Sequence, residues 1–431
     1  MTSVDDDEAP SIEDEGGEKE GPGRWRRVAI DVRPLRHPAY RRIFVGNAAS
    51  YFGTQFTAVA VPVQMYALTH SSLWVGYLGI AGLVPLLVFA LWGGALADVL
   101  DRRRLLFASS VLMWAVTLAL LAQALLRIDS PVLLLALVAV QSAGVAVSMP
   151  TRQAIVPRLV PTGEVPAANT LNYTVGVAAA VVGPLAAGLL IPYNVSWAYG
   201  VDALTFTLAL WSALRLPPLP PEHERVGGRG GLRDVVFGLR YLAGQPVLLM
   251  SFGIDIVAMV LAQPRALFPA VANEHFGGAG AIGWLYAAIA LGSMVAGLTS
   301  GWISRIHRQG IALVAAVVVW GLAVGAAGLA HQLWLAVVLL AVGGAADLVS
   351  AVYRQTILQT YAPDELRGRM QGVFTAVVAG GPRLGDLRAG AMAVPLGVAG
   401  AWVSGGLAAA VVAVLLAAAF PALLRYRVGG R

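Results

Sequence analysis

The sequence predicts an all-α polytopic membrane protein with twelve transmembrane helices. Of its 431 residues, 58% are hydrophobic and only 13% are charged, and the mean hydropathy is +0.71. A soluble protein carries about 25% charged residues. Apolar runs of about twenty residues recur along the chain, each long enough to cross a hydrocarbon core roughly 30 Å thick. Basic residues cluster in alternate loops, as expected for a chain threaded through a membrane.

The chain begins with an acidic segment, residues 1–23, that has no apolar core. This composition is the opposite of a secretory signal peptide and predicts a disordered tail. The chain contains no cysteine, which excludes disulfides and thiolate metal sites. We expect no metal site and no cofactor.

The apolar runs are predicted to span the membrane, with boundaries accurate to a few residues. In chain order they cover 43–67, 73–97, 105–126, 131–150, 166–191, 196–214, 247–271, 279–304, 310–330, 332–353, 369–394 and 398–422. The connecting segments are short, except for 215–246.

Most of the 30 Lys and Arg residues fall on one side of this arrangement, whereas the opposite loops carry only Arg127. The positive-inside rule therefore predicts that both termini and the long central segment are cytoplasmic. That segment, 215–246, begins as a proline- and glycine-rich linker and continues as an amphipathic turn, which favours a short helix on the membrane surface.

The central linker divides the chain into two units of six helices each. The predicted units are 24–214 and 247–422, followed by a cytoplasmic tail at 423–431.

An internal repeat supports this division. "VGYL" at 75–78 corresponds to "IGWL" at 282–285, and "RQAIVPRLVP" at 152–161 corresponds to "RQTILQTYAP" at 354–363. Gly46 and Pro62 match Gly253 and Pro269 in the same order. Two parallel six-helix repeats predict a substrate path between them, opened alternately to each side.

The stretch "GGALADVLDRRR" after the second span resembles the signature loop of the major facilitator superfamily. The matching residues are Gly94, Asp98 and the bases Arg102, Arg103 and Arg104. The loop departs from the pattern at Val99, where a base is usual, and at Asp101, which replaces a glycine.

The fifth span contains "VVGPLAAG", which resembles a motif of exporters in that superfamily. Its residues here are Gly176, Gly183, Pro184 and Gly188. Together with "RRIFVGNAASYFG" and "RLGDLRAG", the pattern is most similar to the enterobactin-exporter branch. The resemblance covers residues 40–422. It implies a secondary transporter whose first, fourth, seventh and tenth helices line a central cavity.

In the family, the acid of the signature loop faces the cytoplasmic start of the eleventh helix, here near Arg367 to Gly372. A helix N-terminus and arginines attract a carboxylate, so Asp98 is predicted to act as a latch, with Gly94, Arg102 and Arg103, that holds the cytoplasmic side shut. The alternative is an ordinary basic loop, which accounts for the arginines but not for Asp98. Arg305 stands at the equivalent place in the second half, so the latch is one-sided.

Charged residues inside a bilayer cost at least about 2 kcal/mol and normally face a cavity or a partner. The resemblance to the family points to Asp347, Asp386 and Asp255 as proton-coupling candidates, and no histidine lies within a span. The alternative for each is a structural ion pair, which we favour for Asp202. Arg383 shares a helix face with Asp386 because the two are three residues apart.

Four polar residues on the expected cavity helices are candidates to contact the substrate. They are Gln55, Gln141, Gln263 and Arg265. Each glutamine is equally suited to bond a neighbouring helix, and Arg265 is suited either to meet an anionic substrate or to reach the membrane interface.

Several functions are excluded. The only lysine is Lys19, in the acidic tail, so a nucleotide-binding phosphate loop is impossible. The arginines are scattered over short loops, which argues against nucleic-acid binding, and the spans lack a catalytic cluster, which argues against an enzyme.

We therefore expect a monomeric exporter of the cell membrane. It would move a small amphiphilic molecule, a siderophore or a drug or natural product, by alternating access in exchange for protons. An importer or facilitator, and a non-transporting receptor or scaffold, are the alternatives.

Overall fold

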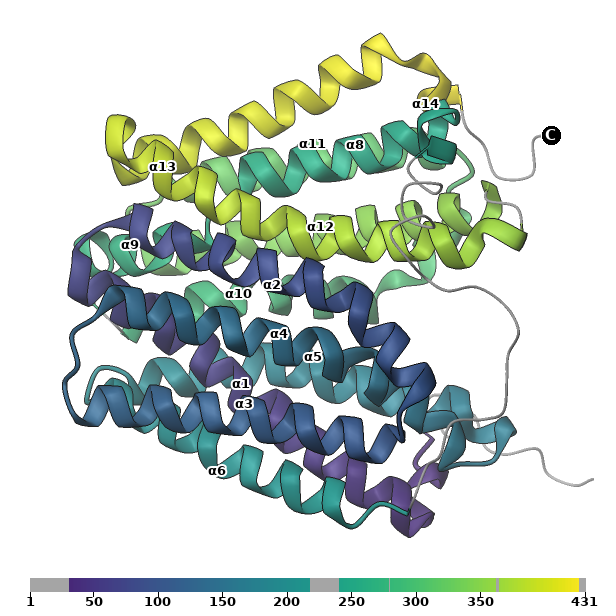
Figure 1. The fold of residues 1–431 in the computed structure, drawn as a ribbon. Helices are drawn as coiled ribbons and strands as arrows, with labels where there is room; N and C mark the ends of the chain where they lie inside the picture. The colour runs from purple at the N-terminus through teal and green to yellow at the C-terminus, as the bar shows by residue number, and fades with distance from the viewer. Residues whose placement is uncertain (1–30, 218–239, 279, 362–363, 426–431) are drawn as a thin grey trace, which may run out of the picture.

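The computed structural model describes residues 31–217, 240–278, 280–361 and 364–425, and all regular secondary structure in these ranges is helical (Figure 1). The acidic tail at 1–23 and the predicted amphipathic surface helix of the central linker lie outside the described residues. Within the described ranges, nine helices are long and apolar enough to cross a membrane.

The first helix group contains six long helices. They are α1 (Pro38–Thr69), α2 (Ser72–Val99), α3 (Arg102–Leu125), α4 (Pro131–Ile155), α5 (Val165–Leu190) and α6 (Val195–Leu214). Polar caps set several boundaries: Asp101 and Ser130 accept hydrogen bonds from backbone N–H groups in the first turns of α3 and α4, and Asn194 does so for α6. Within the group, α1 packs against α5 and α6, and α4 packs against α2 and α3.

The second helix group contains α8 (Pro246–Ala262), α9 (Phe268–His275), α10 (Gly280–Leu298), α11 (Gln309–Ala327), α12 (Leu333–Tyr361), α13 (Asp364–Ala419) and α14 (Pro421–Arg425). The predicted span 247–271 is broken, because α8 ends before Pro264 and a 3-10 turn, Arg265–Leu267, leads into α9. α13 turns sharply at Gly397, whose φ of 70° and ψ of 170° are not helical. Only glycine adopts this conformation readily.

Two predicted spans ended too early. α4 continues past 150 to Ile155, and α12 continues past 353 to Tyr361. Arg152 and Arg354, which the charge pattern assigned to loops, therefore lie on helices. The apolar run stops at these arginines, but the backbone hydrogen bonding does not.

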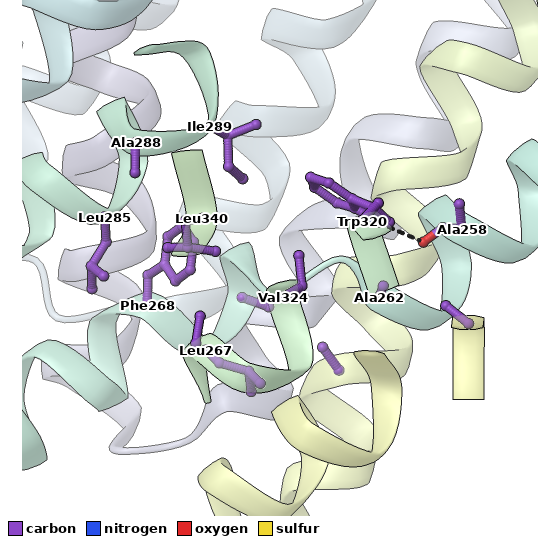
Figure 2. Packing of buried hydrophobic residues seen from close by; sticks show 14 of the residues in the cluster. Ala258, Ala262, Leu267, Phe268, Leu285, Ala288, Ile289, Trp320, Val324 and Leu340 are labelled. Carbon is purple, nitrogen blue, oxygen red and sulfur yellow. Dashed lines mark hydrogen bonds between the residues drawn. The ribbon is translucent and has the colours of Figure 1, made fainter. Parts of the chain in front are cut away.

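One large apolar cluster fills the second group and extends into the first. Figure 2 shows part of it, where Leu267 and Phe268 from the broken helix lie near Leu285 and Leu340. The Trp320 Nε1–H donates to the carbonyl of Ala258 at 3.4 Å, which satisfies the indole within this apolar environment.

Two helix pairs account for most of the contact between the groups: α2 with α13, and α5 with α10. We call the end that carries the α1–α2 turn and Gly397 the turn end, and the end where α3 begins at Arg102 the arginine-rich end (Figure 1). Both pairs meet closely through glycines near the turn end. A Cβ on Gly76 would lie 2.8 Å from the carbonyl oxygen of Asp386, and a Cβ on Gly283 would lie 2.6 Å from that of Pro184.

Candidate substrate cavity

A cavity of about 420 Å³ lies between the two helix groups. Its walls come from α1, α2 and α5 of the first group and from α10, α13 and the break between α8 and α9 of the second. Apolar side chains form much of the lining. The polar and charged side chains are Gln55, Gln263, Arg265, Tyr286, Arg383 and Asp386.

The break in the α8–α9 segment positions part of this polar group. Pro264 cannot donate a helical hydrogen bond, and the chain leaves the helix there. The freed N–H of Ala266 donates to the Asp386 Oδ1 at 3.2 Å, and Arg265 lies exposed on the cavity wall. The structure therefore brings four predicted site residues together: Gln55, Gln263, Arg265 and Asp386.

Arg383 also lines the cavity, on the same face of α13 as Asp386. Within the described residues these two side chains form no ion pair with each other. Instead, the Arg383 Nη1 donates to the carbonyl of Ala379 at 2.6 Å. Most of the guanidinium's hydrogen-bonding capacity thus remains available to the cavity.

Asp255 and Asp347 belong to a second charged cluster and do not line the cavity, although Asp347 also interacts electrostatically with Arg265 of the lining. Arg354 of α12 forms a buried ion pair with Asp255 of α8, and its Nη2 lies 3.8 Å from the Asp347 Oδ1. Asp255 is almost fully buried, whereas the side chain of Asp347 is 31% exposed. Sequence reasoning found both acids but missed the arginine that joins them.

Arg152 is a second arginine that the sequence analysis missed. Its Nη1 donates to the Asn47 Oδ1 of α1 at 2.6 Å, and its Nε donates to the Ser148 hydroxyl at 3.0 Å. The internal repeat aligns Arg152 with Arg354 in sequence, and this alignment could have identified both positions.

The remaining polar candidates do not lie on the cavity wall. Gln141 on α4 is absent from the lining. Asp202 is fully buried in the first group, where the hydroxyls of Thr57 and Thr117 donate to its Oδ2 at 2.5 and 3.4 Å. In the described residues, Asp202 is therefore held by two hydroxyls and has no ion pair, so the expected structural ion pair is wrong.

Comparison with known proteins agrees with this architecture. The family described as transmembrane secretion effector, MFS_3, matches residues 30–427. The enterobactin exporters EntS of Shigella boydii serotype 18 and of Escherichia coli O139:H28 are each 31% identical over 407 residues, covering 91% of this chain and 94% of the relative. This chain belongs to the major facilitator superfamily, in the enterobactin-exporter branch.

The solved structures show the same fold. A variant of the nucleoside transporter NupG superimposes with a TM-score of 0.74 at 15% identity, covering 89% of this chain and 99% of NupG. The resemblance inferred from the signature loop is thus confirmed. The major facilitator chain is a multi-pass membrane transporter, not an enzyme.

The helix-five motif of this major facilitator protein lies on α5 where the two helix groups meet. Gly183 packs against the Cβ of Gln55, Pro184 lines the cavity, and Gly188 meets Gly283 of α10. Gly176 has open space around it. Three of the four motif residues therefore contact α1, the cavity or the second group.

The signature-loop residues Gly94 and Asp98 lie in the last turns of α2. The side chain of Asp98, and all of the partner region Arg367 to Gly372 except Gln371, lie outside what the structure describes in side-chain detail. Arg102 and Arg103 instead bind helix ends within the first group: Arg102 Nη1 donates to the carbonyl of Ala154 at 3.1 Å, and Arg103 Nη2 to that of Leu214 at 2.7 Å. Arginines commonly satisfy such C-terminal carbonyls.

Proposed function

We propose that this protein exports a small amphiphilic molecule of the siderophore type across the cell membrane by alternating access. The observation that carries this proposal is the cavity shared by the two helix groups, with apolar walls and a few convergent polar side chains. Ligand sites of this size and lining are usual for small molecules. The names of the EntS relatives supply the substrate class and the direction of transport.

The proposed architecture has twelve spans in two six-helix bundles, 24–214 and 247–422, in a monomer. Gly397 separates the last two spans within α13, and α8 to α9 count as one broken span. Both termini would be cytoplasmic, which puts the arginine-rich end inside and the turn end outside. The close α2–α13 and α5–α10 contacts then close the outer side of the cavity.

Alternating access would proceed by rocking one bundle against the other. Release to the outside requires these turn-end contacts to separate, while Asp98 and the start of α13 come together at the arginine-rich end. The latch formed by Gly94, Asp98, Arg102 and Arg103 would stabilise that outward-facing state.

Proton entry is the proposed driving force. The candidate carriers are Asp386 in the cavity and Asp255 and Asp347 around Arg354. In the second cluster, Arg354 is placed to hold either acid, because it is ion-paired with Asp255 and 3.8 Å from Asp347. Protonation of one acid would release the arginine toward the other and alter the packing of α12 on α8.

Everted vesicles test this proposal. We expect vesicles that contain the protein to accumulate enterobactin when their interior is acidified, and to lose most of that uptake when the pH gradient is collapsed. Accumulation that ignores the gradient would contradict proton coupling. Accumulation in right-side-out vesicles alone would indicate an importer, and no uptake in either orientation would indicate a receptor or scaffold.

A further inference from the structure

The charged groups of the cavity are not balanced. Its described lining contains two guanidinium groups, Arg265 and Arg383, and one carboxylate, Asp386. No histidine and no second acid lines it in the described part of the chain. Outside the lining, Asp347 lies 3.8 Å from Arg354 and also interacts electrostatically with Arg265, whereas Arg383 has Asp386 as its acidic neighbour. An excess of positive charge in a cavity enclosed by apolar helices favours an anion.

The hydrogen-bonding groups of the cavity point to the same chemistry. Within the described residues, no protein group accepts a hydrogen bond from the Arg265 guanidinium, and neither Gln55 nor Gln263 bonds another side chain. Guanidinium groups have only donors, and amides supply two more. Gln263 is buried, whereas the Arg265 guanidinium is exposed toward the cavity. A ligand with negatively charged oxygen acceptors would satisfy these donors.

We infer that the cavity selects an anionic, oxygen-rich ligand, with Arg265 and Arg383 as its counter-charges and with Asp386 as an opposing charge. This inference rests on the proposed transport function and specifies its substrate class. The planar guanidinium groups match a carboxylate or a phenolate pair, which accept two parallel hydrogen bonds.

The position of Asp386 determines how protons affect binding. The charged and titratable groups that face its carboxylate are Arg265 from the helix break, Arg383 from α13 and Tyr286 from α10, and the N–H of Ala266 donates to it. The adjacent positions on α2 are glycines, Gly76 and Gly79. Protonation of Asp386 removes the negative charge of the described lining and should strengthen anion binding.

Coupling between two ligands is reciprocal, so anion binding in turn favours protonation of Asp386. A proton held there would travel in the same direction as the anion. Antiport requires the opposite linkage, in which proton and substrate exclude each other. If export of an anion is driven by proton entry, a group other than Asp386 must carry the proton.

Direct binding to the purified protein in nanodiscs of uncharged lipid tests this inference. Three aromatic probes of similar size differ in charge: 1-naphthoate, 1-naphthamide and 1-naphthylmethylammonium. We expect 1-naphthoate to bind about tenfold more tightly than either of the others, as one added charge interaction of about 1.4 kcal/mol allows. Arg265→Gln and Arg383→Gln should each remove most of the preference for 1-naphthoate over 1-naphthamide.

Arg305→Gln is the matched control, because Arg305 is exposed on the 3-10 turn that follows α10. It should leave all three affinities unchanged. Equal affinities of wild-type protein for the three probes, or tighter binding of the cation, would overturn the inference. So would an Arg265→Gln protein that keeps the full preference for the anion.

The pH dependence provides a second test. As the pH is lowered over a range in which the probe remains ionised, the affinity for 1-naphthoate should rise several-fold in wild-type protein, because protonation of Asp386 removes a negative charge from the lining. Asp386→Asn should bind with the higher affinity at every pH. A wild-type affinity that falls as the pH falls would refute the assigned role of Asp386. Enterobactin uptake by vesicles stays a separate measurement, so loss of transport and loss of charge selectivity are distinguishable.

Discussion

Arg354 of α12 forms a buried ion pair with Asp255 of α8. The ion pair links two helices of the second group, and both of its side chains are almost fully buried. A charge in this environment is tolerated only when it is paired. The pair is therefore both a structural link and a site whose charge state the protein must control.

Arg354→Leu should destabilise the protein strongly, because it leaves Asp255 buried without a partner. Loss of one member of a buried pair costs about 3–5 kcal/mol. We expect a large fall in the unfolding midpoint in detergent, measured by intrinsic fluorescence. Arg354→Leu combined with Asp255→Leu should recover much of the loss. If the double variant is no more stable than the single one, the pair does not carry this energy.

Asp98→Asn should slow enterobactin transport about two- to fivefold, since a carboxylate at a helix N-terminus is worth about 0.3–1 kcal/mol. The amount of protein in the membrane should not change. Asp101→Ala is the matched control in the same loop. Asp101 caps α3 by accepting from the Arg103 N–H at 2.8 Å, so its loss should lower stability by about 1 kcal/mol. Equal effects of both variants on transport rate would remove the case for a latch.

Gly283→Val should abolish most transport by preventing α10 from closing on α5. A Cβ at Gly283 would lie 2.6 Å from the carbonyl oxygen of Pro184, and overpacking of this kind costs about 1–3 kcal/mol. Gly176→Val should have little effect, because nothing lies within 4 Å of the added Cβ. Transport assays at matched expression compare the two. Normal transport by Gly283→Val would show that this contact does not need to close.

Tyr66→Phe should favour opening at the turn end. The Tyr66 hydroxyl of α1 donates to the Glu274 Oε1 of α9 at 2.8 Å, an exposed hydrogen bond between the two groups. Its loss is worth about 0.5–1 kcal/mol. Since the chain has no native cysteine, Ala58→Cys on the cavity wall gives a single labelling site. We expect an impermeant thiol reagent outside cells to label it about threefold faster in the Tyr66→Phe background. An unchanged rate would argue against a role for this bond in closure.

The helical membrane fold was predictable because apolar length and the basic loops are strong signals in a bilayer. The sharp turn at Gly397 falls in the gap left between the last two predicted spans, 369–394 and 398–422. The break at Pro264 was not located, since the residues around it are as apolar as a continuous span. The long extension of α12 was also missed. The hydropathy falls at the polar residues that follow 353, but α12 continues through them to Tyr361, and Arg354 there is paired with Asp255.

Intramembrane polar residues were good guides to the cavity region. Gln55, Gln263, Arg265 and Asp386 were all singled out by their cost in lipid, and they line one cavity. Gln141 does not line this cavity. Its helix was known from the sequence, but the direction in which its side chain points was not. Arg152 and Arg354 were assigned to loops by the same charge rule that oriented the chain. A rule based on loop charge cannot recognise an arginine that is buried with a partner.

The contacts between α5 and α10 bear on how the substrate specificity of such a transporter can change. Gly188 and Gly283 bring two backbones together without side chains. A backbone contact of this kind does not depend on the chemistry of the substrate in the cavity. A lining side chain such as Arg265, which takes no part in this glycine contact, could be exchanged without altering it. A change of substrate would then require changes in the cavity lining but not in the glycine contact between α5 and α10.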